Sequence, residues 1–586
     1  MPARPSLPLA ALLLLLATCA SPGGDPQHVS RIVLLDQGLT MEERRILHFT
    51  PQGTEIMPAS WLASLRIGPT SETRLMDPEV LARYRFIQDP APDPATNPFG
   101  FPLGFATHVH RGPGGPPEGV RMVGFTCAAC HTGQLNHNGT AILIEGGSAM
   151  HDAVAFQRRM AEAMILTAEL GWKRERFLDE VMRREAWPGG RDALARSFDT
   201  AAARVLVRKP LEDRLEVVKE GHGRLDALQR IANQVLGENL DQPENEQVRD
   251  APVSFPPVWD IWLFDWVQYN ASVRQPMVRN VGEALGVRAR THFLDASGRP
   301  VPAPEKWDTS TLVRDIDLIE RTLHRLRPPR WPAEILGPAD AAEAERGRIA
   351  FGQRCAGCHG IQVIRGTANP PEWHVPVIPL TRIGTDPNAA AGFASRTYDA
   401  SRLGIPERIG GAEALRVLTA AVKTRAYDLL EPSPDAAGRA ELDGFGRENL
   451  VRAPCGYKAR PLIGIWATAP FLHNGSVPTL HDMLSPTRPE RFVVGDREFD
   501  PVKVGYRSDR LEFGTLFDTS ETGNSNQGHW FRDGGGLGVI GPALSDSERS
   551  AIIAYLKVAT AADYPTRLID RPGPAPCETD SRWASR

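Results

Sequence analysis

Two CxxCH motifs constrain the fold of this chain more than any other feature of its sequence. They are Cys127-Ala128-Ala129-Cys130-His131 and Cys355-Ala356-Gly357-Cys358-His359. In such a motif the two thiols can form thioether bonds to the vinyl groups of a haem, and the histidine can bind the iron. A zinc-binding or redox-active CxxC that happens to precede a histidine is the alternative. Because the motif occurs twice, the sequence predicts two covalently bound haem c groups, with His131 and His359 as iron ligands.

The first residues have the pattern of an export signal. Arg4 supplies a short basic region, and residues 7–17 form an apolar stretch that is too short to span a bilayer. Residues 1–20 are therefore predicted to be a signal peptide, which agrees with the attachment of haem c outside the cytoplasm. Cys19 leaves two interpretations open: it is lipidated, as in a bacterial lipoprotein, or removed by ordinary cleavage after Ala20. The protein is expected to be exported, either to the periplasm or extracellular space or as an outer-membrane lipoprotein.

The composition agrees with an exported globular enzyme. A chain of 586 residues suggests two or more domains, and a net charge of −4 gives no reason to expect a nucleic-acid partner. The 53 glycines and 51 prolines predict long loops, as expected where small helices surround a large cofactor that supplies apolar core. Cys455 and Cys577 lie outside the two motifs. In an oxidising compartment they either form a disulfide or remain free thiols.

The residue pattern predicts a mainly α fold with two cytochrome c-type haem domains, long loops rich in proline and glycine, and few strands. Apolar residues recur at helical spacing in residues 153–170, 211–236 and 340–351. A last helix is predicted after Ser545, which forms a capping-box pattern with Glu548. The predicted segments are a signal peptide (1–20), an irregular N-terminal arm (21–100), an N-terminal haem c domain with a helical and aromatic insert (101–330), a C-terminal cytochrome c domain (331–565) and a tail (566–586).

A recognisable signature lies beyond the second motif. It begins with Tyr457-Lys458-Ala459-Arg460-Pro461-Leu462 and continues as Gly464-Ile465-Trp466-Ala467-Thr468-Ala469-Pro470-Phe471-Leu472-His473-Asn474-Gly475-Ser476-Val477-Pro478-Thr479-Leu480. It resembles the signature of the bacterial di-haem cytochrome c peroxidase superfamily, which includes the secreted rubber oxygenases. The form with His-Asn-Gly-Ser-Val-Pro-Thr-Leu is most similar to the rubber-oxygenase-like branch. Residues 126–133, 265–270 and 279–286 support the same branch.

The resemblance implies that the two haems have different roles. Family members usually keep the N-terminal haem open to an oxidant, whereas the C-terminal haem has two protein ligands and relays electrons. His131 is then the ligand of the reactive haem and His359 that of the relay haem. In the peroxidases the second ligand of the relay haem is a methionine, but this chain has Thr487 at that position. The rubber oxygenases use a C-terminal histidine, which predicts His529 as the ligand and His473 as runner-up; otherwise each is a structural loop histidine.

Four aromatic residues are predicted to take part in the chemistry. A tryptophan between the haems transfers electrons in this family, and Trp266 is the candidate, with Trp259 and, outside these four residues, Trp262 as alternatives. Phe255 and Phe264 would form an apolar distal pocket for dioxygen and a hydrocarbon. The competing interpretation is that all four are core residues of a domain interface, because large aromatic side chains dominate packing.

The signature also implies ligands for other groups. Arg460 would form a charge-assisted pair with a haem propionate. The carbonyl groups of Thr468 and Pro470 match donors to a calcium ion in the peroxidases, and calcium prefers such hard oxygen ligands. The expected cofactors are therefore two haem c groups and, by this resemblance, calcium.

The sequence thus predicts a haem-dependent oxidoreductase and leaves three reactions open. In the first, the N-terminal haem activates dioxygen and the protein cleaves an apolar olefin such as polyisoprene, as rubber oxygenases do. In the second, the protein reduces hydrogen peroxide with electrons from a donor protein. In the third, both irons have two protein ligands and the protein only carries electrons. Thr487 in place of a methionine favours the first reaction over the second.

Overall fold

The computed structural model describes residues 29–112, 115–367 and 370–573. The predicted signal peptide with Cys19 lies outside the described residues, as does Cys577. Cys455 forms a disulfide, whereas the four cysteines of the CxxCH motifs are free thiols. None of the helices in the described ranges is both long and apolar enough to cross a bilayer.

Two small sheets hold the first CxxCH motif. The strands of the first are β2 (Met57–Pro58), β4 (Arg121–Phe125) and β3 (Phe105–Val109), which pair antiparallel in that order. Those of the second are β1 (Arg31–Leu34), β6 (Thr140–Glu145) and β5 (Thr132–His137), with β1 parallel and β5 antiparallel to β6. The motif lies between β4 and β5 in a one-turn helix, α5 (Cys127–Cys130). Residues 29–100, expected to be an irregular arm, thus contribute a strand to each sheet.

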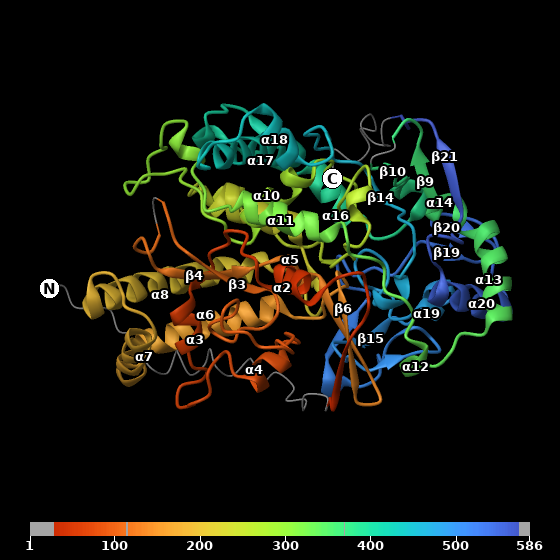
Figure 1. Cartoon of the computed structure of the whole chain (residues 1–586), viewed down its shortest axis with the longest axis horizontal. Coiled ribbons are helices and arrows are strands. Elements are labelled where there is room, and N and C mark those ends of the chain that lie inside the picture. Colours follow the sequence, from red (N-terminus) through yellow and green to blue (C-terminus); the bar gives the residue numbers. More distant parts are fainter. Residues whose placement is uncertain (1–28, 113–114, 368–369, 574–586) are drawn as a thin grey trace.

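A helical layer covers the β2-β4-β3 sheet (Figure 1). Its helices are α3 (Ala59–Ser64), α6 (Ala153–Glu169), α7 (Gly171–Arg184) and α8 (Gly190–Leu215). They pack around Trp61, whose ring stacks on Trp187 at 5.5 Å and meets Phe198 edge-on at 5.2 Å between centroids. The helix predicted at 153–170 is confirmed as α6.

The single helix predicted at 211–236 is wrong. The chain leaves α8 at Leu215 and becomes helical again only at α9 (Ala227–Ala232), followed by a π-helical turn (Asn233–Glu238). Gly221 and Gly223 between them adopt φ of 70° and 75°, a backbone conformation that no helix contains. Apolar spacing alone did not reveal this break.

The central helices pack closely because one of them carries two glycines. These helices are α10 (Pro276–Gly286), α11 (Val313–Leu323) and α17 (Gly411–Asp428). A Cβ on Gly282 would lie 3.3 Å from the side chains of Leu415 and Thr419, and one on Gly286 would lie 2.2 Å from Ile231. The close approach fixes α10 against α17 and α9, and α10 presents further residues toward the first CxxCH motif.

The second CxxCH motif follows a helix, as predicted. Helix α13 (Ala341–Arg354) leads into the motif, which forms α14 (Ala356–His359), and α13 packs along the last helix, α20 (Asp546–Val558). A Cβ on Gly347 would lie only 1.8 Å from the carbonyl oxygen of Ala551, so these two helices touch through backbone. The capping box formed by Ser545 and Glu548 at the start of α20 is confirmed.

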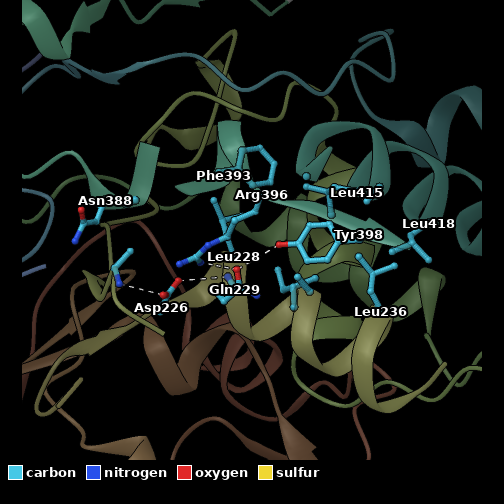
Figure 2. Close-up of a pocket in the computed structure, with 16 residues that line it drawn as sticks. Asp226, Leu228, Gln229, Leu236, Asn388, Phe393, Arg396, Tyr398, Leu415 and Leu418 are labelled. Carbon is cyan, nitrogen blue, oxygen red and sulfur yellow. Dashed lines mark hydrogen bonds between the residues drawn. The ribbon is translucent and has the colours of Figure 1, made fainter. Parts of the chain in front are cut away.

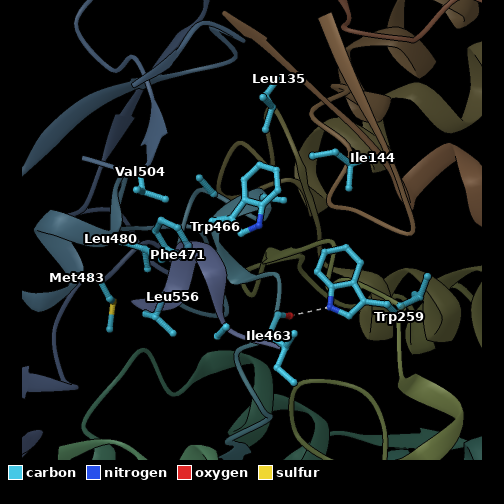
Figure 3. Close-up of a cluster of buried hydrophobic side chains, with 14 of the residues drawn as sticks. Leu135, Ile144, Trp259, Ile463, Trp466, Phe471, Leu480, Met483, Val504 and Leu556 are labelled. Atoms are coloured by element: carbon cyan, nitrogen blue, oxygen red, sulfur yellow. Dashed lines mark hydrogen bonds between the residues drawn. The ribbon is translucent and has the colours of Figure 1, made fainter. Parts of the chain in front are cut away.

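One core joins the N-terminal and C-terminal halves. Leu135 and Ile144 of the β1-β6-β5 sheet belong to the same buried cluster as Trp259, Trp466 and Leu556. Figure 3 shows the Trp259 indole donating a hydrogen bond to the carbonyl oxygen of Ile463 across this core, at 3.0 Å. The segments predicted as separate domains at 101–330 and 331–565 therefore share their packing. Where few strands were expected, the described residues form nine small sheets of two or three strands.

Candidate haem-binding sites

The first CxxCH motif is held in a fixed turn. Thr126 caps α5 by accepting a hydrogen bond from the Ala128 amide at 3.2 Å, and its own hydroxyl donates to the Leu47 carbonyl at 3.3 Å. The Gln52 side chain donates to the Cys127 sulfur at 2.7 Å. Cys127 and Cys130 lie three residues apart on this turn, so both thiols point to one side. Burial raises the pKa of Cys127 to about 12, and the nearby Glu283 and Glu320 add to this shift.

His131 is prepared to act as a neutral ligand. Burial lowers its pKa to about 4, so the imidazole is unprotonated at neutral pH. Phe255 meets the His131 ring edge-on at 6.5 Å between centroids. A second buried histidine, His151, stacks between Phe255 and Phe86 at 5.0 Å from each and borders the same side of the motif.

Helix α10 places a buried charged group beside the first motif. Arg279 pairs with Glu320, which also accepts a hydrogen bond from Asn280 at 2.9 Å. Glu283, one turn further along α10, accepts a hydrogen bond from Gln268 at 3.1 Å, and burial raises its pKa. Although residues 265–270 and 279–286 were singled out in the sequence, these individual side chains were not predicted as site residues. The helical spacing of Arg279 and Glu283 was the signal that could have indicated them.

In the second motif, a hydrogen bond at Nδ1 fixes the ring of His359 and leaves Nε2 available to a metal. The His359 amide donates to the Cys355 carbonyl at 2.9 Å, closing the turn that carries the thiols of Cys355 and Cys358. Nδ1 of His359 donates to the backbone carbonyl of Arg460 at 2.8 Å. That bond selects the tautomer in which Nε2 has a free lone pair, as a metal-binding histidine requires. Burial also lowers the pKa of His359, which keeps the ring neutral.

His529 lies close to His359. The two ring centroids are 6.1 Å apart. Two imidazoles on opposite sides of one metal, with metal–nitrogen distances of about 2.0 Å, would have centroids roughly 6.3 Å apart. Burial lowers the pKa of His529 to about 3, so this ring is neutral as well. At this distance His359 and His529 would together be able to hold one metal ion, such as a haem iron.

The backbone around His529 is held in an unusual conformation. His529 has φ of 52°, in the left-handed region, and Gly528 before it has φ of 78°. A Cβ on Gly528 would lie 2.3 Å from the carbonyl oxygen of Ile383, so only glycine fits. The His529 amide donates to that same carbonyl at 2.9 Å. Strained positions that the surrounding structure imposes are typical of functional sites.

Arg488 stabilises the loop that carries His529. Its guanidinium donates hydrogen bonds to the carbonyl oxygens of Asn526, Gly528 and His529 at 2.5, 2.9 and 3.0 Å. It also lies over the Trp530 ring, 3.9 Å from the centroid. The position one residue before it, where the peroxidases were expected to have methionine, is the exposed Thr487. Sequence reasoning missed Arg488, because nothing local indicates that it would reach a loop some forty residues later.

His473, the runner-up ligand, faces elsewhere. Its ring stacks on Tyr457 at 3.8 Å and meets Tyr269 edge-on at 6.2 Å. Burial lowers its pKa to about 3. The structure therefore brings His529 to His359 and packs His473 among tyrosines.

Arg460 connects the surroundings of the two motifs. Its backbone carbonyl holds His359, while its guanidinium donates to the carbonyl oxygens of Pro257 at 2.6 Å and Trp259 at 3.2 Å. Pro257 and Trp259 lie in the segment 255–259, whose first residue, Phe255, contacts His131. A continuous set of covalent and hydrogen bonds thus runs from one CxxCH histidine to the neighbourhood of the other.

The four predicted aromatic residues occupy different places. Phe255 contacts His131, whereas Phe264 lies under Arg460 at 5.1 Å. Trp259 is fully buried in the shared core. Trp266 lies under the guanidinium of Arg452 at 3.7 Å. Only Phe255 of the four makes a ring contact with a CxxCH histidine in the described structure.

The calcium prediction stays a prediction. Thr468 uses its hydroxyl to donate to the Ile465 carbonyl at 2.9 Å, and the following Ala469–Pro470 peptide is cis. Across the described ranges, no group of three or more His, Cys, Asp or Glu side chains is arranged to hold a metal ion.

A cavity away from both motifs lies between α9, α16 (Asn388–Ser395) and α17 (Figure 2). It encloses about 30 Å³, which is room for about two water molecules. Its polar residues satisfy one another, because Arg396 donates to Gln229 at 2.5 Å and to Asp250 at 2.7 Å, and Tyr398 donates to Gln229 at 3.3 Å. Size and pairing make this cavity a structural feature rather than a substrate site.

Comparisons with known proteins agree with the motif geometry. Residues 456–493 match a family model described as RoxA-like, cytochrome c-like, which supports the rubber-oxygenase-like branch of the resemblance. The chain is 39% identical over 572 residues to the uncharacterized protein y4iJ of Sinorhizobium fredii (strain NBRC 101917 / NGR234), covering 91% of this chain and 94% of y4iJ. It is 29% identical over 273 residues to the uncharacterized protein y4iM of the same organism, covering 46% of this chain and 52% of y4iM. The chain therefore belongs to the family of y4iJ and is a haem-dependent redox protein with a RoxA-like, cytochrome c-like segment.

Proposed function

We propose that this protein is an exported di-haem c-type oxidoreductase that activates dioxygen at the N-terminal haem and cleaves an apolar olefin. The C-terminal haem serves as an electron relay. The observation that carries the proposal is an asymmetry between the motifs. The His529 ring lies 6.1 Å from that of His359, whereas the ring that meets His131, at 6.5 Å, belongs to Phe255, which cannot ligate iron.

The residues present fit two covalent haems. Each motif offers two free thiols on one turn and a neutral histidine, and the second has a further neutral histidine, His529, close by. When bound, a haem with only one protein ligand supplies a site for dioxygen or peroxide, and one with two protein ligands supplies electron transfer. The chain's own contribution is to hold His131, His359 and His529 neutral and oriented.

Protein groups around the first motif would shape the reaction. Phe255, stacked on His151, keeps an apolar wall beside His131, which suits a hydrocarbon more than a charged substrate. Glu283, the Arg279–Glu320 pair and His151 are polar groups that could orient or exchange a proton there. The hydrogen bonds through Arg460 support an electron relay between the two motifs, because electrons pass more readily along bonded groups than across empty space.

The olefin itself rests on the resemblance to rubber oxygenases. The test is to incubate the purified di-haem protein aerobically with polyisoprene, without peroxide or reductant, and to analyse products by mass spectrometry. Isoprenoid fragments with carbonyl ends are the expected result. Their absence, in a protein whose spectrum still shows one five-coordinate haem, would refute olefin cleavage.

Peroxide reduction is the alternative on the same scaffold. It would appear as hydrogen peroxide consumption that depends on a reduced donor protein, in preparations that yield no olefin fragments. If the spectrum instead showed two low-spin haems and neither activity, the protein would be an electron carrier.

A further inference from the structure

A small cavity borders the first CxxCH motif. It encloses about 10 Å³, which is room for one water molecule. Ala128 and Ala129 of the motif form part of its wall, and so does Thr132, the residue that follows His131. The other lining residues are Arg85, Phe86, Ile87, Leu103, Ala149 and His151. All of the lining residues except Ile87 are buried, so the cavity lies inside the protein.

Two polar atoms of the residues that line this cavity have no hydrogen-bond partner among the described residues. They are Nε2 of His151 and Oγ1 of Thr132. His151 is 2% exposed and Thr132 is 1% exposed, so bulk solvent does not reach either atom. Because a buried polar atom without a partner lowers the stability of the fold, nearly all such atoms in proteins bind another group or an ordered water. Both atoms therefore indicate a polar ligand that fits this cavity.

The His151 ring is held in one orientation by its neighbours. Phe86 and Phe255 both stack on it, each with ring centroids 5.0 Å from its own and planes within 20°. The Ala129 backbone of the motif engages the ring as well, and Nε2 is the nitrogen that keeps no partner. With both faces covered by phenyl rings, only the edge of the imidazole remains for a polar ligand.

Water fits the cavity better than an ion does. A buried water needs two to four polar partners, and His151, Thr132 and Arg85 are the polar side chains in the wall. The Arg85 guanidinium already donates from Nε to the Gly495 carbonyl and from Nη1 to the Ala82 carbonyl, each at 2.6 Å. An anion such as phosphate exceeds the volume.

We propose that this cavity binds one ordered water molecule, which bridges Nε2 of His151 and Oγ1 of Thr132 and thereby positions His131. A bridging water is enthalpically nearly as good as a direct hydrogen bond. It completes a closed set of contacts around the first motif, because Thr132 follows His131 in the chain, His151 stacks on Phe255, and Phe255 meets the His131 ring. The water site is independent of the proposed function, whereas its effect on a haem ligand rests on the proposal that the first motif binds haem.

The first test is a high-resolution crystal structure of the full-length protein as purified. The wild type should show one water within hydrogen-bond distance of both atoms, and so should Thr132→Ser, which keeps the hydroxyl. Thr132→Val replaces the hydroxyl by a methyl group of similar size and should lose this water. His151→Phe, which keeps the stack of rings, should lose it as well. A wild-type cavity without water density, or a water that persists unchanged in Thr132→Val, would overturn the inference.

The second test asks whether the water positions His131. Resonance Raman spectroscopy of the reduced holo-protein measures the stretching band between the iron and His131. Thr132→Val should shift this band, whereas Thr132→Ser should keep the wild-type frequency. The matched control is Thr140→Val on the adjacent strand β6, outside the cavity wall, which should leave the band unchanged.

An unshifted band in haem-loaded Thr132→Val would overturn the positioning role. If the wild-type first motif carries no haem, the proposed function fails, while the crystal structures still decide on the water. If Thr132→Val does not fold, His151→Phe replaces it in both tests, with the same expected and contrary results.

Discussion

Replacing Arg488 by methionine should release the loop that carries His529. In the structure the guanidinium donates to three carbonyl oxygens of residues 526–529 and lies over Trp530. Burial lowers its pKa to about 9, so it is charged at neutral pH. Hydrogen bonds from a charged group contribute about 1.5 to 3 kcal/mol each. Counting only those to Gly528 and His529, their loss should cost about 3 to 6 kcal/mol of local stability.

The assay is hydrogen–deuterium exchange at two amides of this loop. The His529 amide donates to Ile383 at 2.9 Å and the Trp530 amide donates to Gly538 at 2.7 Å, so both report on loop opening. A loss of about 3 kcal/mol corresponds to roughly 100-fold faster exchange. With haem bound, the same variant should show part of the His359 haem converting from low spin to high spin.

The control is Arg491→Met, three residues further along the chain. Arg491 forms an ion pair with Asp518 at 2.7 Å, but its side chain is 66% exposed. Exposed pairs contribute about 0 to 1 kcal/mol, so this variant should exchange nearly as the wild type does. Less than tenfold faster exchange in Arg488→Met, or an equal effect of Arg491→Met, would refute the reasoning.

Three further predictions follow from individual contacts. Gly528→Ala should destabilise the protein and displace His529, because its Cβ would meet the Ile383 carbonyl at 2.3 Å. Gly534→Ala is also at positive φ but in open space, so it should cost only about 1 to 2 kcal/mol for the left-handed backbone conformation. Thermal unfolding and the haem spin state compare the two variants. Acid should weaken the fold below pH 6.5. Burial lowers the pKa of both His151 and His473 to about 3, so between pH 3 and 6.5 the unfolded state binds more protons than the folded one. Each histidine then removes up to about 1.4 kcal/mol per pH unit as pH falls, and a urea midpoint unchanged between pH 7 and 5 would contradict this. Gly347→Ala should separate α13 from α20, since its Cβ would lie 1.8 Å from a backbone oxygen, and should lower the melting temperature more than Gly352→Ala on the open side of α13.

Local sequence signals predicted the elements whose causes are local. The CxxCH spacing identified both motifs, and the apolar period and cap residues placed α6, α13 and α20 within a few residues. The same reasoning failed at 211–236, where apolar spacing continued across two glycines with positive φ. Periodicity records which face a segment would bury, and it carries no information on a backbone conformation that interrupts the helix.

The strands and the shared core depended on distant partners. β1 pairs with β6, which lies over a hundred residues further along the chain, so an arm that looked irregular alone became part of a sheet. A strand of four residues has too little pattern to be identified until its neighbour is known. For the same reason the domain boundary near residue 330 did not reveal that residues on both sides pack into one cluster.

The sequence by itself determined the chemistry of the two CxxCH motifs, because thiols and a histidine at fixed spacing must lie on one turn. Only the tertiary structure decided how the rest of each site is built. His529 reaches His359, Arg488 supports His529, and Arg460 joins the two motifs through contacts between residues far apart in the chain. Such contacts follow from how helices and strands pack, which the identity of single residues does not encode locally.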